Sequence, residues 1–272
     1  ITKSGRKLKK VKHGPYKEAL IKIDKRWGQR EIWATIKLIG NRYTTVHYLA
    51  AVDHHYDANG NIVPQPEVRQ IYIIIFNRTL WISLLVTVLC LILGYPIAYL
   101  LATLPLRYSN LLMIMVLLPF WTSLLVRTTT WIVLLQSNGV INDIMVWIGL
   151  ISNEGRIRMI YNQTGTIIAM TQILLPFMVL PLYSVMKTIS SSYVRAAQSM
   201  GATPALAWFK IYLPMSVPGI GAGALLVFIL SIGYYITPAL VGGETGTMIS
   251  NFIAHHMKSS LNWGLAAALG TI

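Results

Sequence analysis

Residues 80–104 read LWISLLVTVLCLILGYPIAYLLATL, a run of 25 residues without Asp, Glu, Lys or Arg. A bilayer core about 30 Å thick requires about 20 residues of α-helix to cross it. Because lipid offers no partner to backbone N–H and C=O groups, a spanning segment of this length must be a helix, which pairs these groups internally. The stretch therefore predicts a transmembrane helix and an all-α membrane fold.

Further apolar runs follow along the chain. Leu111–Leu135, Gly165–Met186 and Gly219–Leu240 are each long enough to cross a bilayer. A fifth run, Leu261–Ile272, has only 12 residues, and we expect it to be the beginning of a span in a truncated chain. The sequence thus predicts a polytopic membrane helix bundle.

Composition separates a basic head from an apolar body. Hydrophobic residues make up 54% of the chain, charged residues only 12%, and the mean hydropathy is +0.56. Soluble domains have about 25% charged residues, so this composition excludes a soluble enzyme and a disordered chain. Residues 1–70 hold 14 Lys/Arg and six Asp/Glu, whereas residues 71–272 hold nine and three. We therefore expect a basic segment over 1–70 and a transmembrane domain over 71–272.

The charges of the short loops predict the orientation. Lys and Arg are enriched in cytoplasmic loops, and two loops carry an excess of them, from Arg107 in one and from Lys187, Arg195 and Lys210 in the other. Segments 105–110 and 188–210 are then cytoplasmic. The basic segment 1–70 is then extracytoplasmic, so we expect a preceding transmembrane helix that this sequence does not contain.

The basic segment reads as partly helical. Tyr16–Ile39 carries apolar residues at helical spacing, and Asn59-Gly60 is typical of a turn. Near the start of the segment lies a lysine cluster formed by Lys7, Lys9, Lys10 and Lys12. No aromatic residues are interleaved with these lysines, so we expect a solvated tail and no nucleic-acid partner.

The loop 188–214 reads TISSSYVRAAQSMGATPALAWFKIYLP and predicts two short helices. Ser190 offers a helix cap, Gly201 suits the left-handed residue that ends a helix, and Thr203-Pro204 suits the start of a second one. The first helix has an apolar face formed by Tyr193, Ala196, Ala197 and Met200. Because its alanines are small, this face can press closely into a groove on another protein.

This loop resembles that of the permease subunits of binding-protein-dependent ABC importers. Their cytoplasmic loop carries Glu-Ala-Ala, then Gly after three residues, then Ile-x-Leu-Pro after nine. The chain has Arg195-Ala196-Ala197, Gly201 and Ile211-Tyr212-Leu213-Pro214 at the same spacing. Six of the seven specified positions match, and the departure is Arg195 where the family has Glu.

The chain is similar in particular to the spermidine/putrescine permease branch of that family, from about residue 71 to the end. The stretches that carry this similarity are LPFWTS at 118–123, Arg127, Trp131, LLPFMVLPLYS at 174–184 and TPALVGG at 237–243.

The resemblance implies a fold, a location and partners. It implies the type I ABC importer permease bundle in the bacterial inner membrane, a second permease subunit, two ATP-binding cassette subunits and an extracytoplasmic solute-binding protein. Membrane lipid surrounds such a bundle. The contact with the ATPase subunits is expected from residues of the loop: Tyr193, Arg195, Ala196, Ala197, Met200, Gly201, Ala202 and Pro214.

We expect this chain to be a transport subunit with no catalytic site, metal or cofactor of its own. It contains no Gly-x-x-x-x-Gly-Lys-Ser/Thr segment to cradle phosphates, so ATP and Mg²⁺ are expected on the partner ATPase subunits. Cys90 is the only cysteine, and the His54-His55 and His255-His256 pairs are poorly spaced for metal binding.

A polyamine solute is the expectation that the resemblance gives, although the spans contain no acidic residue. Aromatic side chains can pass a cation by weak cation–π contacts. The candidate path residues are Trp121, Arg127, Trp131, Asp143, Tyr234, Tyr235 and Glu244, of which the two acids are mouth groups. Interface belts and helix packing are the alternative role of the aromatics. For Arg127, snorkelling to the outer interface is the expectation.

A secondary transporter or channel that ATP does not drive is the alternative class. Such proteins usually carry intramembrane acids or histidines for ion coupling, and the four predicted spans contain none.

Overall fold

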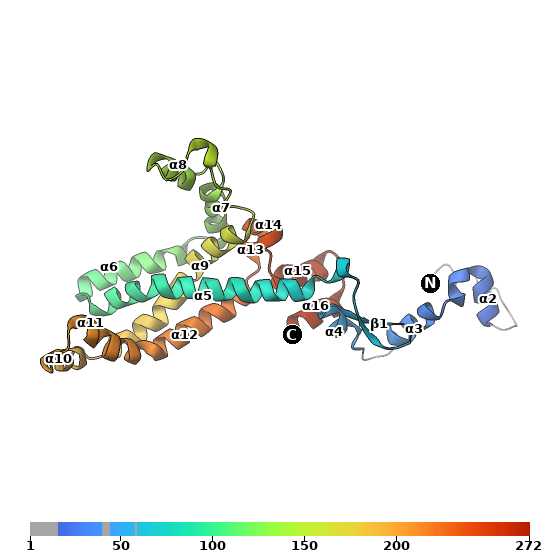
Figure 1. Ribbon diagram of the computed structural model, residues 1–272, viewed down its shortest axis with the longest axis horizontal. Helices are drawn as coiled ribbons and strands as arrows, with labels where there is room; N and C mark the ends of the chain where they lie inside the picture. Colours follow the sequence, from blue (N-terminus) through green and yellow to red (C-terminus); the bar gives the residue numbers. More distant parts are fainter. Residues whose placement is uncertain (1–15, 40–43, 58) are drawn as a thin grey trace. The chain divides into compact units, whose positions relative to one another are not determined.

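The computed structural model describes residues 16–39, 44–57 and 59–272 (Figure 1). The lysine cluster lies outside the described residues. The chain forms two compact units. The first takes in the residues up to Ile74 together with Ile253–Ile272, and the second is Ile75–Phe252.

The first unit consists mainly of short helices and one hairpin. Its elements up to the first long helix are α2 (Tyr16–Ile23), the 3₁₀ turn η1 (Lys25–Gly28), α3 (Arg30–Ile39), α4 (Val46–Ala51), β1 (His54–Tyr56), β2 (Ile62–Pro64) and the 3₁₀ turn η2 (Glu67–Arg69). The helix expected over 16–39 is interrupted at Asp24. This residue has an extended backbone, and its carboxylate accepts a 3.0 Å hydrogen bond from the Arg26 backbone N–H. Aspartate often competes with helical hydrogen bonding in this way.

The hairpin joins β1 and β2 in antiparallel register, with His54 opposite Pro64 and Tyr56 opposite Ile62. Gly60 has a φ of +86°, a conformation that glycine adopts without steric cost. Its N–H donates to the Asp57 carbonyl at 2.9 Å. The turn predicted at Asn59-Gly60 is therefore present.

The long helix α5 (Tyr72–Thr103) begins at a buried carboxylate. Asp53 is 3% exposed, and it accepts hydrogen bonds from the backbone N–H groups of Ile71, Tyr72 and Ile73 at 3.1, 3.1 and 2.8 Å. The first N–H groups of a helix have no partner within it, and negative charge there is favourable. Asp53 therefore fixes the residue at which α5 begins.

Replacing Asp53 with alanine is expected to destabilise the first unit by about 3 kcal/mol, because the Tyr72 and Ile73 N–H groups lose their buried acceptor and the Ile71 N–H keeps only the Arg69 carbonyl. Limited proteolysis of the purified protein in increasing urea measures this loss. Glu67→Gln, at an exposed acid in η2, is the matched control and should behave as the wild type. Equal resistance of the two variants would contradict the role given to Asp53.

The second unit contains the long helices. Its elements after α5 are α6 (Leu106–Leu117), the 3₁₀ turn η3 (Leu118–Trp121), α7 (Leu124–Leu135), α8 (Val140–Trp147), the 3₁₀ turn η4 (Asn153–Gly155), α9 (Gln163–Thr188), α10 (Ser191–Ser199), α11 (Pro204–Ala207), the π-helical turn η5 (Trp208–Tyr212), α12 (Leu213–Ile232), α13 (Ile236–Val241) and α14 (Gly243–Gly246). Helix α15 (Ile249–Lys258) leads from this unit back into the first unit, where α16 (Trp263–Thr271) packs on α4.

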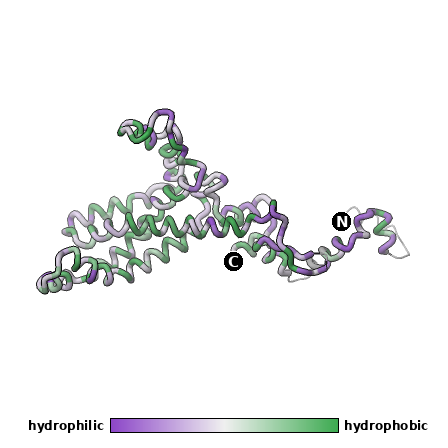
Figure 2. The backbone as a smooth tube through the Cα atoms, viewed as in Figure 1, coloured by the Kyte–Doolittle hydropathy of each residue, from purple (hydrophilic) through white to green (hydrophobic). Residues whose placement is uncertain are grey.

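Three helices of the described chain are long and apolar enough to cross a membrane: α5, α9 and the continuous segment Pro204–Ile232. Figure 2 shows apolar residues along them, in contrast to the polar part of the chain near the N-terminus. The predicted spans at 80–104 and 165–186 correspond to α5 and α9.

The predicted span Leu111–Leu135 is wrong as a single straight helix. Thr122 and Ser123 have extended backbones, and the segments on either side, 106–121 and 124–147, meet at 96°. The Thr122 N–H and hydroxyl both donate to the Pro119 carbonyl, at 3.2 and 2.8 Å, which closes the first arm. Hydropathy does not register this turn because both arms are apolar.

The predicted span Gly219–Leu240 is misplaced. Helix α12 begins at Leu213 and continues the helical path of α11 and η5 without a break. Its last residue is Ile232, with Gly233 as the C-cap, and a separate short helix, α13, follows. The helix therefore extends into the loop that the sequence assigns to 188–214.

The core of the second unit lies where α5, α9 and α12 meet. Met178 of α9 lies between glycines of the other two helices. A Cβ at Gly94 would come 3.1 Å from its Cγ, and a Cβ at Gly223 would come 2.7 Å from its sulfur. Buried apolar side chains surround this crossing: Ile82, Val86, Cys90, Leu101, Leu174, Leu182 and Val227. Small residues allow helices in a membrane to approach closely, and these two glycines leave the space in which α5 and α12 pack against Met178 of α9.

Candidate functional site

The loop between α9 and α12 folds into two short helices at one end of the second unit, as Figure 1 shows for α10 and α11. Ser190 caps α10 by accepting from the Ser192 N–H, and Thr203 caps α11 by accepting from the Leu206 N–H. Gly201 has a φ of +92°, and the Ala202 N–H donates to the Ala197 carbonyl at 3.1 Å, which is the hydrogen bond of a Schellman helix end. These local features agree with the sequence prediction.

The apolar face of α10 divides into a buried and an exposed part. Ala197 is only 4% exposed, and its neighbour Val194 packs against the core of its own chain. Ala197 therefore packs against its own chain. The prediction that it lies with Ala196 on the surface that meets a partner is wrong. Tyr193, Ala196 and Met200 remain on the outer side, and Met200 is 81% exposed. We call these three residues the exposed face of α10.

The other loop residues singled out in the sequence lie around this face. The Arg195 side chain is exposed and donates to the Ser191 hydroxyl at 3.3 Å. It meets no carboxylate among the described residues, so the position where the family has Glu is open to a partner. Pro214 is the second residue of α12 and follows the π-helical turn η5 within the continuous helical segment.

Two pairs of aromatic rings connect the loop to α5. Trp208 contacts Tyr95 edge to face at a centroid distance of 5.7 Å, and Tyr212 contacts Tyr99 at 5.1 Å. We call these four residues the aromatic clasp. Each such ring pair stabilises the contact by about 1 kcal/mol beyond the free energy of burying its apolar area. The loop is continuous with α9 and α12, and these contacts also connect it to α5, so a displacement of the loop affects all three helices. The clasp was not predicted from the sequence. A signal for it exists, because the aromatic residues stand four positions apart on both sides, Tyr95 and Tyr99 on α5 and Trp208 and Tyr212 in the loop.

The candidate path residues do not form one cluster. Trp121 is 90% exposed at the end of η3. Trp131 of α7 donates from its indole N–H to the Gln172 Oε1 of α9 at 3.3 Å, so it packs between helices. Asp143 forms a 2.8 Å ion pair with Arg156 and is therefore not a free mouth group.

Arg127 points inward, in contrast to the expected snorkelling. Its Nε and Nη1 atoms are buried without a hydrogen-bond acceptor in the described part of the chain. Thr128 and Thr237 meet at 3.4 Å beside it, joining α7 to α13. Tyr235 contributes its backbone carbonyl to Asn251 at 3.1 Å. The structure thus places the Arg127 side chain inside the second unit, and no hydrogen bond or ion pair joins it to the other candidate path residues that the structure describes.

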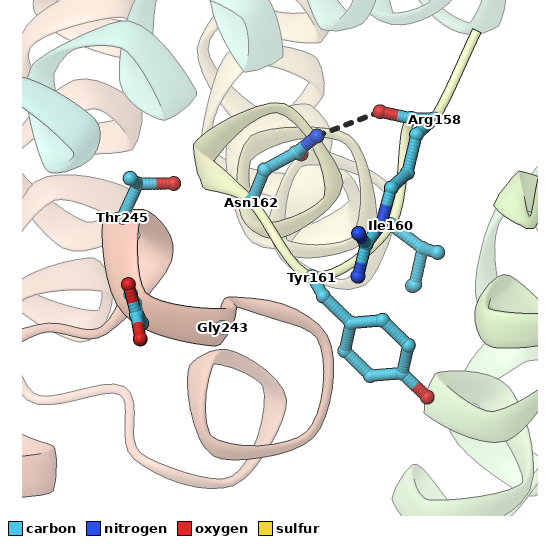
Figure 3. Close-up of a pocket in the computed structure, with 7 residues that line it drawn as sticks. Arg158, Ile160, Tyr161, Asn162, Gly243 and Thr245 are labelled. Atoms are coloured by element: carbon cyan, nitrogen blue, oxygen red, sulfur yellow. Dashed lines mark hydrogen bonds between the residues drawn. The ribbon is translucent and has the colours of Figure 1, made fainter.

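A hollow of about 610 Å³ lies at the opposite end of the second unit from the loop, where α9 begins and α14 follows α13. Its walls are Arg158, Ile160, Tyr161, Asn162, Gly243, Glu244 and Thr245 (Figure 3). In this view the Arg158 and Tyr161 side chains lie close together, and the guanidinium carbon is 6.0 Å from the ring centroid. Of the candidate path residues, only Glu244 lines this hollow. We call it the mouth hollow.

Membrane-spanning helices joined by a capped helical loop define the second unit as a polytopic helical membrane protein. The family model described as binding-protein-dependent transport system inner membrane component matches residues 79–272. The chain belongs to this family, and it is a permease subunit of an ABC importer in the bacterial inner membrane.

Particular relatives place the chain within the family. It is 34% identical to the spermidine/putrescine transport system permease protein PotB of Escherichia coli over 198 residues, which are 73% of this chain and 71% of PotB. Among solved structures, a bacterial ABC transporter involved in import of the acidic polysaccharide alginate matches 88% of this chain and 81% of its own, with 21% identity and a TM-score of 0.57. The alginate transporter in complex with an alginate pentasaccharide-bound periplasmic protein matches 74% and 72%, with 23% identity and a TM-score of 0.53. These two structures support the fold alone.

Proposed function

We propose that this permease subunit forms half of the translocation path of a polyamine importer. A second permease subunit forms the other half, two ATP-binding cassette subunits drive it, and a solute-binding protein delivers the solute. The similarity to PotB over 198 residues supports the solute class. The periplasmic protein bound to the alginate transporter supports the binding-protein partner.

The exposed face of α10 is the observation that carries the proposed coupling. Tyr193 and Met200 leave apolar surface uncovered on α10, with small Ala196 between them. A helix that lays such a face into a groove is a common mode of protein recognition. The ATPase subunit bears the groove in this proposal, and ATP and Mg²⁺ bind there, while this chain hydrolyses nothing and needs no cofactor.

Coupling then follows from the loop's connections. Closure of the ATPase subunits on ATP displaces α10, and the aromatic clasp and the unbroken path from α11 into α12 carry the displacement into the spans. Packed helices move between discrete arrangements rather than deforming continuously. The spans therefore change from outward to inward access as a body.

Uptake of radiolabelled spermidine by cells that express the complete importer tests the solute and the class together. We expect saturable uptake that unlabelled putrescine inhibits and that amino acids and sulfate do not. An inactive ATPase subunit should abolish it. Uptake that persists without an active ATPase would favour the secondary transporter or channel, and uptake insensitive to putrescine would contradict the polyamine assignment.

Replacing Tyr99 with alanine is expected to uncouple the importer, because the loop loses a ring contact to α5. Uptake should fall about tenfold, which corresponds to about 1.4 kcal/mol, while ATP hydrolysis by the complex continues. Both rates are measured on the same purified importer in proteoliposomes. Tyr108→Ala, at an exposed tyrosine of α6, is the control. Equal loss of uptake and hydrolysis would indicate a structural role instead.

A further inference from the structure

The walls of the mouth hollow have an unusual and closely packed backbone conformation. Tyr161 has a φ of +58° and Gly243 a φ of +55°. A bulky residue with positive φ is a strained outlier that the surrounding structure must hold in place, and such residues gather at functional sites. A Cβ at Gly243 would collide with the Tyr161 carbonyl, so only glycine, which adopts a positive φ without steric cost, fits against the strained Tyr161.

Hydrogen bonds fix both walls of the hollow. The Gln163 N–H donates to the Thr245 hydroxyl at 3.2 Å, and the Thr166 hydroxyl donates to the Gly246 carbonyl at 3.2 Å, so the start of α9 is tied to α14. The Arg78 side chain holds the same loop through the Glu244 carbonyl at 2.7 Å. The Asn162 side chain donates to the Arg158 carbonyl at 2.8 Å, as the dashed line in Figure 3 marks. The Tyr161 ring is therefore presented from a rigid frame.

The chemistry of the walls suits an organic cation. The Arg158 guanidinium 6.0 Å from the centre of the Tyr161 ring shows that this ring face accepts a positive charge. The Glu244 carboxylate makes no ion pair within the described residues, so it is available as a counter-charge in the same hollow. The ammonium group of a dissolved solute can take the place of the Arg158 guanidinium over the Tyr161 ring.

We propose that the mouth hollow is the entry site for a terminal ammonium group of the solute, an extended organic polycation. The ammonium displaces Arg158 from the Tyr161 ring and pairs with Glu244. The hollow lies at the end of α9 opposite the loop 188–214, which is expected in the cytoplasm, and it is therefore on the extracytoplasmic side, where the solute arrives. This inference rests on the proposed polyamine import, which supplies the solute class.

Equilibrium binding of radiolabelled spermidine to the complete importer in nanodiscs, without the solute-binding protein, tests the site. Tyr161→Leu should weaken binding about tenfold, because it removes the ring face but keeps the bulk, and Tyr161→Phe should stay within about twofold of wild type. Glu244→Gln should weaken the binding of spermidine and of putrescine, because both end in the primary ammonium group that pairs with this carboxylate. Arg158→Gln should tighten binding by removing the competing cation. Tyr108→Leu is the control for an exposed tyrosine elsewhere.

Several outcomes would overturn the proposal. Unchanged spermidine binding in both Tyr161→Leu and Glu244→Gln would show that the hollow does not hold the solute. So would variants that bind spermidine normally but need more solute-binding protein for half-maximal uptake, since the hollow would then be a docking surface for that protein. If cells take up spermidine but the wild-type importer in nanodiscs binds none, the site proposed here is refuted and the polyamine function is not. If cells take up no spermidine, the polyamine function itself is refuted.

Discussion

Ala196→Trp is expected to abolish uptake while the protein remains folded and inserted in the membrane. Ala196 lies on the exposed face of α10 between Tyr193 and Met200, and it is turned away from its own core. A tryptophan there adds a large side chain to a surface that a partner must approach closely. We expect uptake to fall about 100-fold, because overpacking at a tight contact costs about 3 kcal/mol.

The choice of residue makes this prediction specific. Ala197 is buried in its own chain, so a large residue there would disrupt the loop itself and would not report on the partner. Gln198→Trp is the matched control, because Gln198 is exposed on the other side of the same helix. Radiolabelled spermidine uptake and the amount of protein in the membrane are measured for each variant. Normal uptake by Ala196→Trp at normal expression would remove the basis of the coupling proposal.

Gly223→Val is expected to destabilise the helix bundle by about 3 kcal/mol. A Cβ at this position of α12 would lie 2.7 Å from the Met178 sulfur and 3.2 Å from the Met178 carbonyl oxygen. The sulfur can move, but the backbone carbonyl of α9 cannot move without separating the two helices. A branched side chain adds further atoms at the same place, and overpacking of this kind costs about 1–3 kcal/mol or more.

Gly221→Val gives the comparison for the glycine contact. Gly221 lies in the same helix, and a Cβ there meets nothing within 4 Å. Thermal unfolding of the detergent-solubilised protein, followed by loss of the folded peak in size-exclusion chromatography, should show a lower Tm for Gly223→Val only. Similar Tm values for the two variants would mean that α9 and α12 do not pack through this glycine.

The long apolar helices could be predicted from hydropathy, because residues 80–103 of α5 and 165–186 of α9 carry no charged side chain. A segment of this length in lipid must pair its backbone groups internally, as a helix does. The caps at Ser190 and Thr203 and the left-handed Gly201 could also be predicted, since each depends on a local residue preference. The change in direction of the chain at Thr122 could not be predicted. The bend at Thr122 lies inside an apolar stretch, and hydropathy measures transfer into lipid and not the path of the backbone.

Features that depend on distant residues also escaped prediction. A helical period identifies an apolar face, but it does not say which part of the face the chain itself covers, and so Ala197 was grouped with Ala196. The mouth hollow brings Tyr161 beside Gly243 and Glu244, which are far away in the sequence and share no motif with it. The strain at Tyr161 is visible only in the folded backbone.

Site-directed disulfide cross-linking in the complete importer tests the central claim most directly. The chain's buried Cys90 is first replaced by alanine. A cysteine is then placed by Met200→Cys on the exposed face of α10, and single cysteines are placed across the partner ATPase surface. The account predicts a cross-link from position 200 to the ATPase subunit, and none from Gln198→Cys on the other side of the helix. No cross-link from position 200 to any ATPase cysteine, together with labelling of that position by an impermeant maleimide outside intact cells, would contradict it.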